Sequence, residues 1–270
     1  MSKQICAPGN SYDYTCFGMD SLKRIANKLN KDERFNTYKD IKLSKYNKSN
    51  KKKLVKEVQR KLNCKKQLDF CVLEKNQEFY DEIKKAIKPK VPTGGKYEWL
   101  STIDIRDVMN QYEKKYKDFN FMGTFPMDFL QIYNELANIN VKSLCKKKKK
   151  IGIIFNTDVS TGTGEHWISM FLNMEDRTIC FFDSVGDKPP KPVWKLIKNI
   201  AIQAKLMGCP LKIIINRRQF QFLNSECGVF SLWFLISRLR GDSCDYLFKK
   251  SKTEVNDKNI NKLRGKYFRK

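Results

Sequence analysis

The chain of 270 residues contains a single histidine, His166, beside nine cysteines. One histidine cannot supply the His pairs and His clusters of many zinc sites, and we expect neither a metal nor a cofactor. Nucleophilic catalysis by a Cys–His or Ser–His pair must therefore use this one imidazole as its general base. His166 follows the glycine-rich segment STGTGE and begins an apolar segment. This position predicts an accessible side chain at a strand edge, although a packing histidine is an ordinary alternative.

Cys227 is the cysteine best placed for nucleophilic chemistry. It follows the loop QFLNSE and opens a strongly apolar segment that predicts a helix. A thiol at a helix N-terminus lies at the positive end of the helix dipole, which favours the thiolate. Gly228 leaves space for a substrate carbonyl beside the backbone. A buried core cysteine at a helix start explains the same local pattern, and this pattern alone leaves both interpretations open.

Two further side chains lie at positions that catalysis could use. Asp183 ends the apolar segment RTICFFDS, and a hairpin with HWISMFLN brings its carboxylate near His166, where it can fix the tautomer. Gln221 precedes Cys227 by six residues, and its amide can donate to a developing oxyanion together with the Cys227 N–H. Gln219 is the neighbouring alternative. Each residue has an ordinary structural explanation, but the four stand at element boundaries in the chain order His, Asp, Gln, Cys.

The segments that position these residues predict an α+β fold. Helical spacing and capping residues indicate helices over Ser21–Leu29, Lys52–Leu62, Glu78–Ile87, Trp99–Tyr116, Pro126–Ile139, Lys191–Gly208 and Cys227–Gly241. Apolar runs bounded by turn residues indicate strands over Ile151–Asn156, His166–Asn173, Arg177–Ser184 and Leu211–Asn216. We expect a mixed, mostly antiparallel sheet packed between helices.

The segment KPKVPTGGKYEW interrupts the pattern and predicts a hinge near residue 92. We therefore expect a basic, mainly helical N-terminal arm domain over 1–92, a core domain over 93–248, and a mobile basic C-terminal tail over 249–270. The hinge contains Gly94-Gly95-Lys96, where self-cleavage is one hypothesis and a plain flexible linker is the other.

The chain carries 54 Lys and Arg against 29 Asp and Glu, a formal net charge of +25. The electrostatic field of such a positive charge attracts nucleic acid and other polyanions. A coding bias towards lysine gives the same composition without such a partner. No zinc-finger or RNP signature indicates a dedicated nucleic-acid reader. No apolar run is long enough for a membrane span, and the N-terminus lacks a signal core, so we expect a protein that is not secreted. The odd number of cysteines without a C-x-x-C pair then predicts reduced thiols.

Four motifs together resemble a known family. They are Glu98-Trp99-Leu100-Ser101, His166-Trp167, Phe182-Asp183-Ser184 and Gln221-x5-Cys227-Gly228. In order and spacing they are similar to the cysteine proteases of the ubiquitin-like-protein (SUMO) protease and adenain group, over roughly residues 97–240. The lysine-rich composition and the basic arm most resemble the members of this group from large cytoplasmic DNA viruses, of the African swine fever virus type. Glu226 stands where Asp is the commoner residue before the nucleophile.

The resemblance implies a papain-like or adenain-like cysteine protease core and a role for each matching residue. It implies Cys227 as nucleophile, His166 as general base, Asp183 as the residue that orients the imidazole, and Gln221 in the oxyanion hole. Trp99 and Trp167 match the two tryptophans that wall the family's narrow tunnel for Gly-Gly substrates. Flat indoles can close over glycines, which have no side chain to clash, although core packing is the ordinary explanation of a tryptophan.

The leading hypothesis is a viral cysteine endopeptidase that cleaves structural polyproteins after Gly-Gly during virion maturation. We then expect it at the assembly site in the host cytoplasm and in the virion core, with its basic arm associating with nucleic acid or a nucleocapsid. One alternative is an isopeptidase that removes SUMO or ubiquitin. An acetyltransferase with the same catalytic order ranks lower, because no cofactor-binding insertion is evident. A non-enzymatic basic core protein is the last alternative, and the complete quartet of residues argues against it.

Overall fold

The computed structural model describes residues 5–10, 12–36, 38–92 and 98–270. The chain divides into two compact units, Met1–Lys90 with Phe268–Lys270, and Val91–Tyr267. The functional division into arm, core and tail stays a prediction. Gly94-Gly95-Lys96, the hypothetical self-cleavage site, lies outside the described residues.

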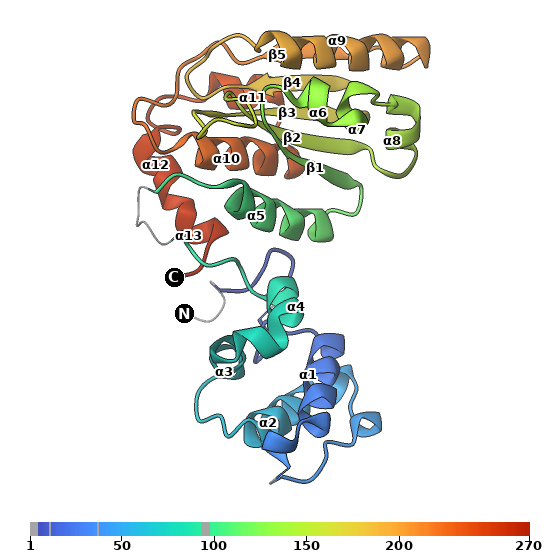
Figure 1. The fold of residues 1–270 in the computed structure, drawn as a ribbon, viewed down its shortest axis with the longest axis vertical. Coiled ribbons are helices and arrows are strands. Elements are labelled where there is room, and N and C mark those ends of the chain that lie inside the picture. The colour runs from blue at the N-terminus through green and yellow to red at the C-terminus, as the bar shows by residue number, and fades with distance from the viewer. Residues whose placement is uncertain (1–4, 11, 37, 93–97) are drawn as a thin grey trace. The chain divides into compact units, whose positions relative to one another are not determined.

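The N-terminal unit is helical (Figure 1). Its helices are α1 Met19–Lys31, α2 Lys51–Lys61, α3 Leu68–Glu74 and α4 Asn76–Ala86, with 3₁₀ turns η2 Glu33–Phe35, η3 Leu43–Lys45 and η4 Lys48–Asn50. In α1, Leu22, Ile25, Ala26 and Leu29 are buried at the spacing of one helix face, and they share a core with the other helices. The predicted helices near α1, α2 and α4 are confirmed. Helix α3 was not predicted, because seven residues give little periodicity.

The larger unit is built on a five-stranded sheet in the order β1-β2-β3-β4-β5. The strands are β1 Phe119–Phe125, β2 Lys150–Asn156, β3 Trp167–Asn173, β4 Thr178–Phe182 and β5 Lys212–Ile215. The β2–β3 and β3–β4 pairs are antiparallel, whereas β1–β2 and β4–β5 are parallel. The expected mixed α+β fold is confirmed, but the expectation of a mostly antiparallel sheet is wrong, because two of the four strand pairs are parallel. The parallel β1 was missed because Gly123, at a φ of +132°, interrupts its short pattern at a register shift.

Helices cover both faces of this sheet (Figure 1). Helix α9 Lys191–Leu206 packs on one face, against alternate strand residues such as Ile168 and Met170 of β3. Helix α10 Cys227–Leu239 packs on β3 from the opposite face and is buried along its whole length. A strand covered on both faces is buried throughout, as all seven residues of β3 are, and five of the seven are apolar, the exceptions being Ser169 and Asn173.

Local sequence signals fix several helix ends. Helix α5 Thr102–Lys115 starts at a reciprocal cap, in which the Ser101 hydroxyl accepts from the Asp104 N–H and the Asp104 carboxylate accepts from the Ser101 N–H. After α9 and α10 the chain turns at Gly208 and Gly241, with φ of +74° and +101°, as predicted for glycine after a helix.

Three short helices lie between β1 and β2, where one helix over Pro126–Ile139 was expected. They are α6 Phe129–Ile132, α7 Asn134–Ala137 and α8 Val141–Lys147. The expected helix is broken at Tyr133, whose backbone is extended and whose ring packs edge-on against Phe125 at 5.0 Å between centroids. Tertiary packing of this ring therefore outweighs the helical pattern.

The C-terminal segment differs from the expected mobile tail. It contains α11 Cys244–Lys249, α12 Asp257–Lys262 and α13 Arg264–Tyr267. Val255, Ile260 and Tyr267 are buried. These apolar residues are too widely spaced to give a periodic signal, so their burial depends on the surface that the rest of the fold offers. None of the described helices is long and apolar enough to span a membrane.

The expectation of reduced thiols is wrong for six cysteines. Disulfides join Cys6 to Cys16, Cys64 to Cys71, and Cys180 to Cys244, while the free cysteines are Cys145, Cys209 and Cys227. Cys180 and Cys244 are 64 residues apart in sequence, yet their Cα atoms lie 6.6 Å apart. Such pairs depend on tertiary proximity, which cysteine spacing does not reveal.

Candidate active site

The β3–β4 hairpin brings His166 and Asp183 together. His166 directly precedes β3 and Asp183 directly follows β4, and in an antiparallel pair the start of one strand neighbours the end of the other. The His166 Nε2 and the Asp183 Oδ1 are 2.7 Å apart. Asp183 is buried and also accepts the Val185 N–H through Oδ1. The predicted contact between the imidazole and this carboxylate is present, and it leaves Nδ1 as the other ring nitrogen.

The ionisation of His166 is set by its neighbours. Burial by itself lowers the pKa of the imidazole, but hydrogen bonds and charges from Asp183 and Cys227 outweigh burial and raise the pKa of His166 to about 10. The imidazolium form is therefore favoured beside these two partners. Since Nε2 faces Asp183, the geometry leaves Nδ1 for the Cys227 thiol.

Cys227 is the first residue of α10, as the apolar pattern predicts, and it is buried. It lies at the positive end of a 13-residue helix. Gly228 makes a close approach to another segment, and the expected space for a carbonyl stays a prediction. A Cβ on Gly228 would lie 3.0 Å from the Leu100 Cβ, so the glycine lets the first turn of α10 approach the segment before α5. No local pattern predicts this contact, because Leu100 and Gly228 are far apart along the chain.

Gln221 lies beside this group and is held at both ends of its amide. Its Oε1 accepts from the Ser184 hydroxyl at 2.6 Å, and its Nε2 donates to the Leu223 carbonyl at 2.6 Å. An amide nitrogen has two hydrogens, so one remains for another acceptor. Gln221 lines a cavity together with His166. The alternative residue, Gln219, lines the same cavity but donates its Nε2 to the Gln221 carbonyl oxygen.

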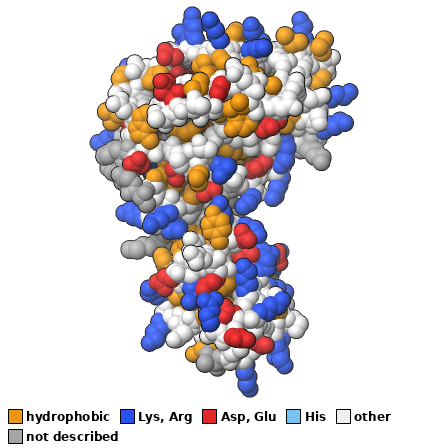
Figure 2. Space-filling model, in the orientation of Figure 1, with side chains coloured by type: hydrophobic (Ala, Val, Ile, Leu, Met, Phe, Trp, Pro, Cys, Tyr) orange, Lys and Arg blue, Asp and Glu red, His pale blue; other side chains and the backbone are white. Residues whose placement is uncertain are grey.

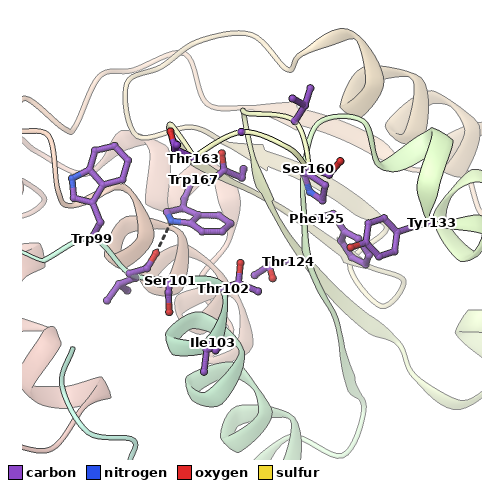
Figure 3. A pocket seen from close by; sticks show the side chains of 16 residues that line it. Trp99, Ser101, Thr102, Ile103, Thr124, Phe125, Tyr133, Ser160, Thr163 and Trp167 are labelled. Atoms are coloured by element: carbon purple, nitrogen blue, oxygen red, sulfur yellow. Dashed lines mark hydrogen bonds between the residues drawn. The ribbon is translucent and has the colours of Figure 1, made fainter. Parts of the chain in front are cut away.

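The two tryptophans differ in how firmly they are held. The Trp167 indole is buried and donates its Nε1 hydrogen to the Leu100 carbonyl at 2.8 Å, whereas Trp99 is 42% exposed. Figure 3 shows both indoles at one end of a cavity whose far end is walled by Phe125 and Tyr133. Of the two tryptophans that line this cavity, Trp167 is therefore held in place by the fold, whereas Trp99 presents an exposed ring.

Trp99 lines two cavities. The first, of about 570 Å³, is lined by Trp99 and Trp167 and by residues of α5, β1 and the loop before β3. The second, of about 440 Å³, is lined by Trp99, His166, Gln221 and the loop that leads to Cys227. Trp99 is therefore a side chain that the two cavities share.

Asn216 and Ser184 hold other site residues in place, and neither was predicted to do so. Asn216 follows β5, is fully buried, and donates its Nδ2 to the Asp183 carbonyl oxygen at 2.6 Å. The Ser184 carbonyl accepts the N–H groups of Phe220 and Gln221, which adds to its hydroxyl contact with the Gln221 amide. A polar residue directly after an apolar strand was the available signal for Asn216. Within the described part of the chain, no three His, Cys, Asp or Glu side chains form a group that could hold a metal ion.

The chain is similar in sequence to viral cysteine proteases. Over 175 residues the chain is 35% identical to a thiol protease of Acanthamoeba polyphaga mimivirus, covering 64% of this chain and 57% of that protein. It is 27% identical over 202 residues to a SUMO-1 cysteine protease of African swine fever virus, covering 68% of this chain and 71% of the viral enzyme. The chain thus spans little more than half of the mimivirus protein.

The fold matches a solved structure over its whole length. A crystal structure of an African swine fever virus protease superposes with a TM-score of 0.70 at 19% identity, covering all of this chain and 97% of the other. The expected fold is thereby confirmed. Residues 102–269 match the sequence profile described as Ulp1 protease family, C-terminal catalytic domain. This segment holds His166, Asp183, Gln221 and Cys227, and the chain belongs to the Ulp1 family of cysteine proteases.

Proposed function

We propose that the protein is a cysteine endopeptidase in which Cys227 is the nucleophile and His166 the general base. The observation that carries the proposal is the His166–Asp183 contact of 2.7 Å, with the Cys227 thiol as the other partner of the imidazole. A thiol, an imidazole and an orienting carboxylate form the arrangement that activates a cysteine for attack on a carbonyl.

The first half of the reaction forms an acyl-enzyme. The Cys227 proton resides on His166, and the thiolate attacks the carbonyl carbon of the substrate, forming a C–S bond and an oxyanion. The backbone N–H of Cys227 and the remaining N–H of the Gln221 amide stabilise the oxyanion. The C–N bond then breaks, and the leaving amine takes the proton from His166.

The second half releases the acid product. His166, now neutral, accepts a proton from water as the water oxygen attacks the thioester carbonyl. The C–S bond breaks, and the thiolate of Cys227 is restored beside a protonated His166. Asp183 keeps the same ring nitrogen of His166 occupied throughout, so the nitrogen facing Cys227 carries out both proton transfers.

The arrangement of the tryptophans favours small residues before the scissile bond. A substrate that reaches from the Trp167 cavity to His166 passes the Trp99 ring, where glycines present no side chain. The wider cavity walled by Phe125 and Tyr133 is suited to larger residues further upstream. We propose that the enzyme cleaves viral structural polyproteins after Gly-Gly, at the assembly site in the host cytoplasm and in the virion.

An isopeptidase acting on SUMO or ubiquitin is the second candidate. One observation favours it, since a relative that is 27% identical is named a SUMO-1 cysteine protease. Such an enzyme uses the same chemistry but recognises a folded modifier through a broad surface, so the two candidates differ in substrate and agree in mechanism.

The test compares cleavage of two substrates by wild type, by Cys227→Ala and by Cys209→Ala. One substrate is a fluorogenic peptide with Gly-Gly before the scissile bond, and the other is a SUMO or ubiquitin fusion. Cys209 is also a free cysteine, so its variant controls for loss of a thiol elsewhere. We expect peptide cleavage that is lost only in Cys227→Ala.

The two substrates separate the candidates. Rapid cleavage of the fusion with poor turnover of the peptide indicates the isopeptidase. Cleavage of the peptide with the fusion left intact supports the endopeptidase. If neither substrate is cleaved in a Cys227-dependent manner, the proposed function is contradicted.

A further inference from the structure

The C-terminal helices contact the loop that leads to Cys227. At the start of α12, the Asp257 Oδ2 accepts the Phe222 N–H at 3.0 Å. At the start of α13, the Arg264 Nη2 donates to the Ser225 carbonyl at 3.0 Å. A loop fixed at both ends in this way presents the residue that follows it in one position.

A buried chain of hydrogen bonds joins Arg264 to the residue before the nucleophile. The Arg264 Nε donates to the Asn261 Oδ1 at 3.0 Å, and the Asn261 Nδ2 donates to the Glu226 Oε1 at 2.6 Å. Glu226 is fully buried and Arg264 is 4% exposed. Burying a charge is costly unless it is compensated, and the Asn261 amide links these two opposite charges without direct contact between them.

The Glu226 carboxylate is thereby turned away from the helix that it precedes. Glu226 is the N-cap residue of α10, yet its side chain makes no capping hydrogen bond. Its oxygens accept instead from the Ser225 N–H and hydroxyl and from Asn261. The first-turn N–H groups of α10, including that of Cys227, are therefore not taken up by a capping carboxylate.

We propose that Arg264, acting through Asn261, holds the Glu226 carboxylate away from the N-terminus of α10 and so reserves the positive end of that helix for Cys227. In this role Arg264 and Asn261 are positioning residues, because neither needs to touch the substrate. The inference rests on the proposed nucleophilic role of Cys227. Without Arg264 the buried Glu226 loses its compensating charge and Asn261 loses its partner. The Glu226 carboxylate is then free to turn towards the unpaired N–H groups at the start of α10.

The charged groups around Cys227 indicate how a displaced Glu226 carboxylate changes the stability of the Cys227 thiolate. Cys227 interacts with His166, and Arg264 interacts electrostatically with Cys227 and Glu226. Arg264 is also within electrostatic range of Asp104 and Glu98. A carboxylate moved to the N-terminus of α10 adds a negative charge beside the thiolate and occupies N–H groups, and both changes disfavour the thiolate.

The test measures alkylation of Cys227 by iodoacetamide across pH, with mass spectrometry of the modified peptide, and peptide hydrolysis in parallel. Arg264→Met removes the charge. We expect alkylation about tenfold slower near neutral pH, with recovery as the pH rises. The kcat for peptide cleavage falls by a similar factor, while KM stays nearly unchanged.

The decisive variant combines Arg264→Met with Glu226→Gln. If the freed carboxylate causes the loss, a neutral side chain at position 226 restores most of the alkylation rate. A merely structural role predicts that the double variant is at least as slow as the single one. Lys266→Met is the matched control, because it removes an exposed cation from the same helix and is expected to leave alkylation unchanged.

Asn261→Ala, alone and with Glu226→Gln, repeats the comparison should Arg264→Met fail to fold. A folded single variant with wild-type alkylation, or a folded double variant no faster than its parent, overturns the inference. Alkylation needs no substrate, so an enzyme that leaves Gly-Gly peptides uncleaved still reports on Arg264. Failure of the proposed function and failure of this inference are thus distinguishable.

Discussion

At the scale of single residues, the candidate site depends on which partner each titratable group faces. His166 has a carboxylate on one side and a thiol on the other, and these partners raise the pKa of His166 to about 10 despite the opposing effect of burial. Asp183 is fixed in turn by the Val185 N–H on its side chain and by Asn216 on its carbonyl. The imidazole is thus oriented by a carboxylate that is itself held in place.

Asp183→Asn is expected to lower kcat by about 10²-fold or more, because the imidazole loses its orienting charge. The pKa of His166 falls from about 10 towards the ordinary 6.5, so the alkaline limb of the pH–rate profile moves to lower pH. A profile with the wild-type alkaline limb contradicts this role.

The raised pKa of His166 also predicts how the stability of the fold depends on pH. Because the folded-state pKa of His166 lies above 6.5, its proton stabilises the fold fully below that pH, and this contribution is lost as the pH rises towards about 10. Urea unfolding of wild type and Asp183→Asn across this range measures the difference. We expect a smaller loss of stability between the two pH values in the variant.

Gln221 and Gln219 line the same cavity, so their variants form a matched comparison of the oxyanion role. Gln221→Ala is expected to lower kcat by about 10²-fold, as for loss of one oxyanion donor. Gln219→Ala removes an amide from the same cavity and is expected to cause a much smaller loss. Steady-state kinetics of both variants on one peptide decides between them, and equal losses contradict the assignment of Gln221.

At the scale of elements, the site depends on close approaches between segments. The first turn of α10 contacts the segment before α5, where Leu100 also accepts from Trp167. Gly228→Ala is expected to reduce the free energy of unfolding by about 1–3 kcal/mol, because the new methyl group overlaps Leu100. Activity falls with it, since the nucleophile and the Trp99 segment are displaced together.

Gly265→Ala is the control for this glycine. A Cβ at Gly265 meets nothing within 4 Å, and alanine favours a helix over glycine by up to ~1 kcal/mol. Thermal unfolding of both variants is the measurement. Destabilisation by Gly265→Ala equal to that by Gly228→Ala contradicts the contact with Leu100 as the cause.

The Cys180–Cys244 disulfide joins β4, the strand that directly precedes Asp183, to α11. Loss of this crosslink in Cys180→Ala/Cys244→Ala is expected to lower the free energy of unfolding by about 2–4 kcal/mol. Alkylation of the denatured, unreduced protein is expected to label three of the nine cysteines. Labelling of all nine shows instead that the crosslinks do not form.

At the scale of the whole molecule, the dominant feature is charge. Residues 1–90 hold 23 Lys and Arg against 11 Asp and Glu, so nearly half of the net +25 belongs to the first third of the chain. Figure 2 shows Lys and Arg spread over the visible face of both units. A surface of this kind attracts polyanions through many weak contacts.

We propose electrostatic association with nucleic acid on this basis, and it makes a prediction about salt. At low ionic strength, added DNA is expected to bind the enzyme and change the rate of peptide cleavage, and the effect disappears as salt screens the charges. Fluorescence anisotropy of labelled DNA over a salt series measures the binding. Binding that is insensitive to salt contradicts an electrostatic origin.

The sequence by itself determined many of the elements and the residue types at their ends. Apolar periodicity located β2, β3, β4, α9 and α10, and it placed His166 directly before β3 and Cys227 at the start of α10. These predictions succeeded because period, capping residues and glycine stops are local properties that neighbouring residues carry.

Only the tertiary structure decided how distant segments meet. The approach of Leu100 to Gly228, the Cys180–Cys244 crosslink and the link from Arg264 to Glu226 all join residues that are far apart in sequence. Each depends on the complementary surfaces of packed elements, and no local pattern encodes which polar side chain finds which partner. The C-terminal segment shows this most clearly, because its few apolar residues are buried against a surface that the rest of the chain supplies.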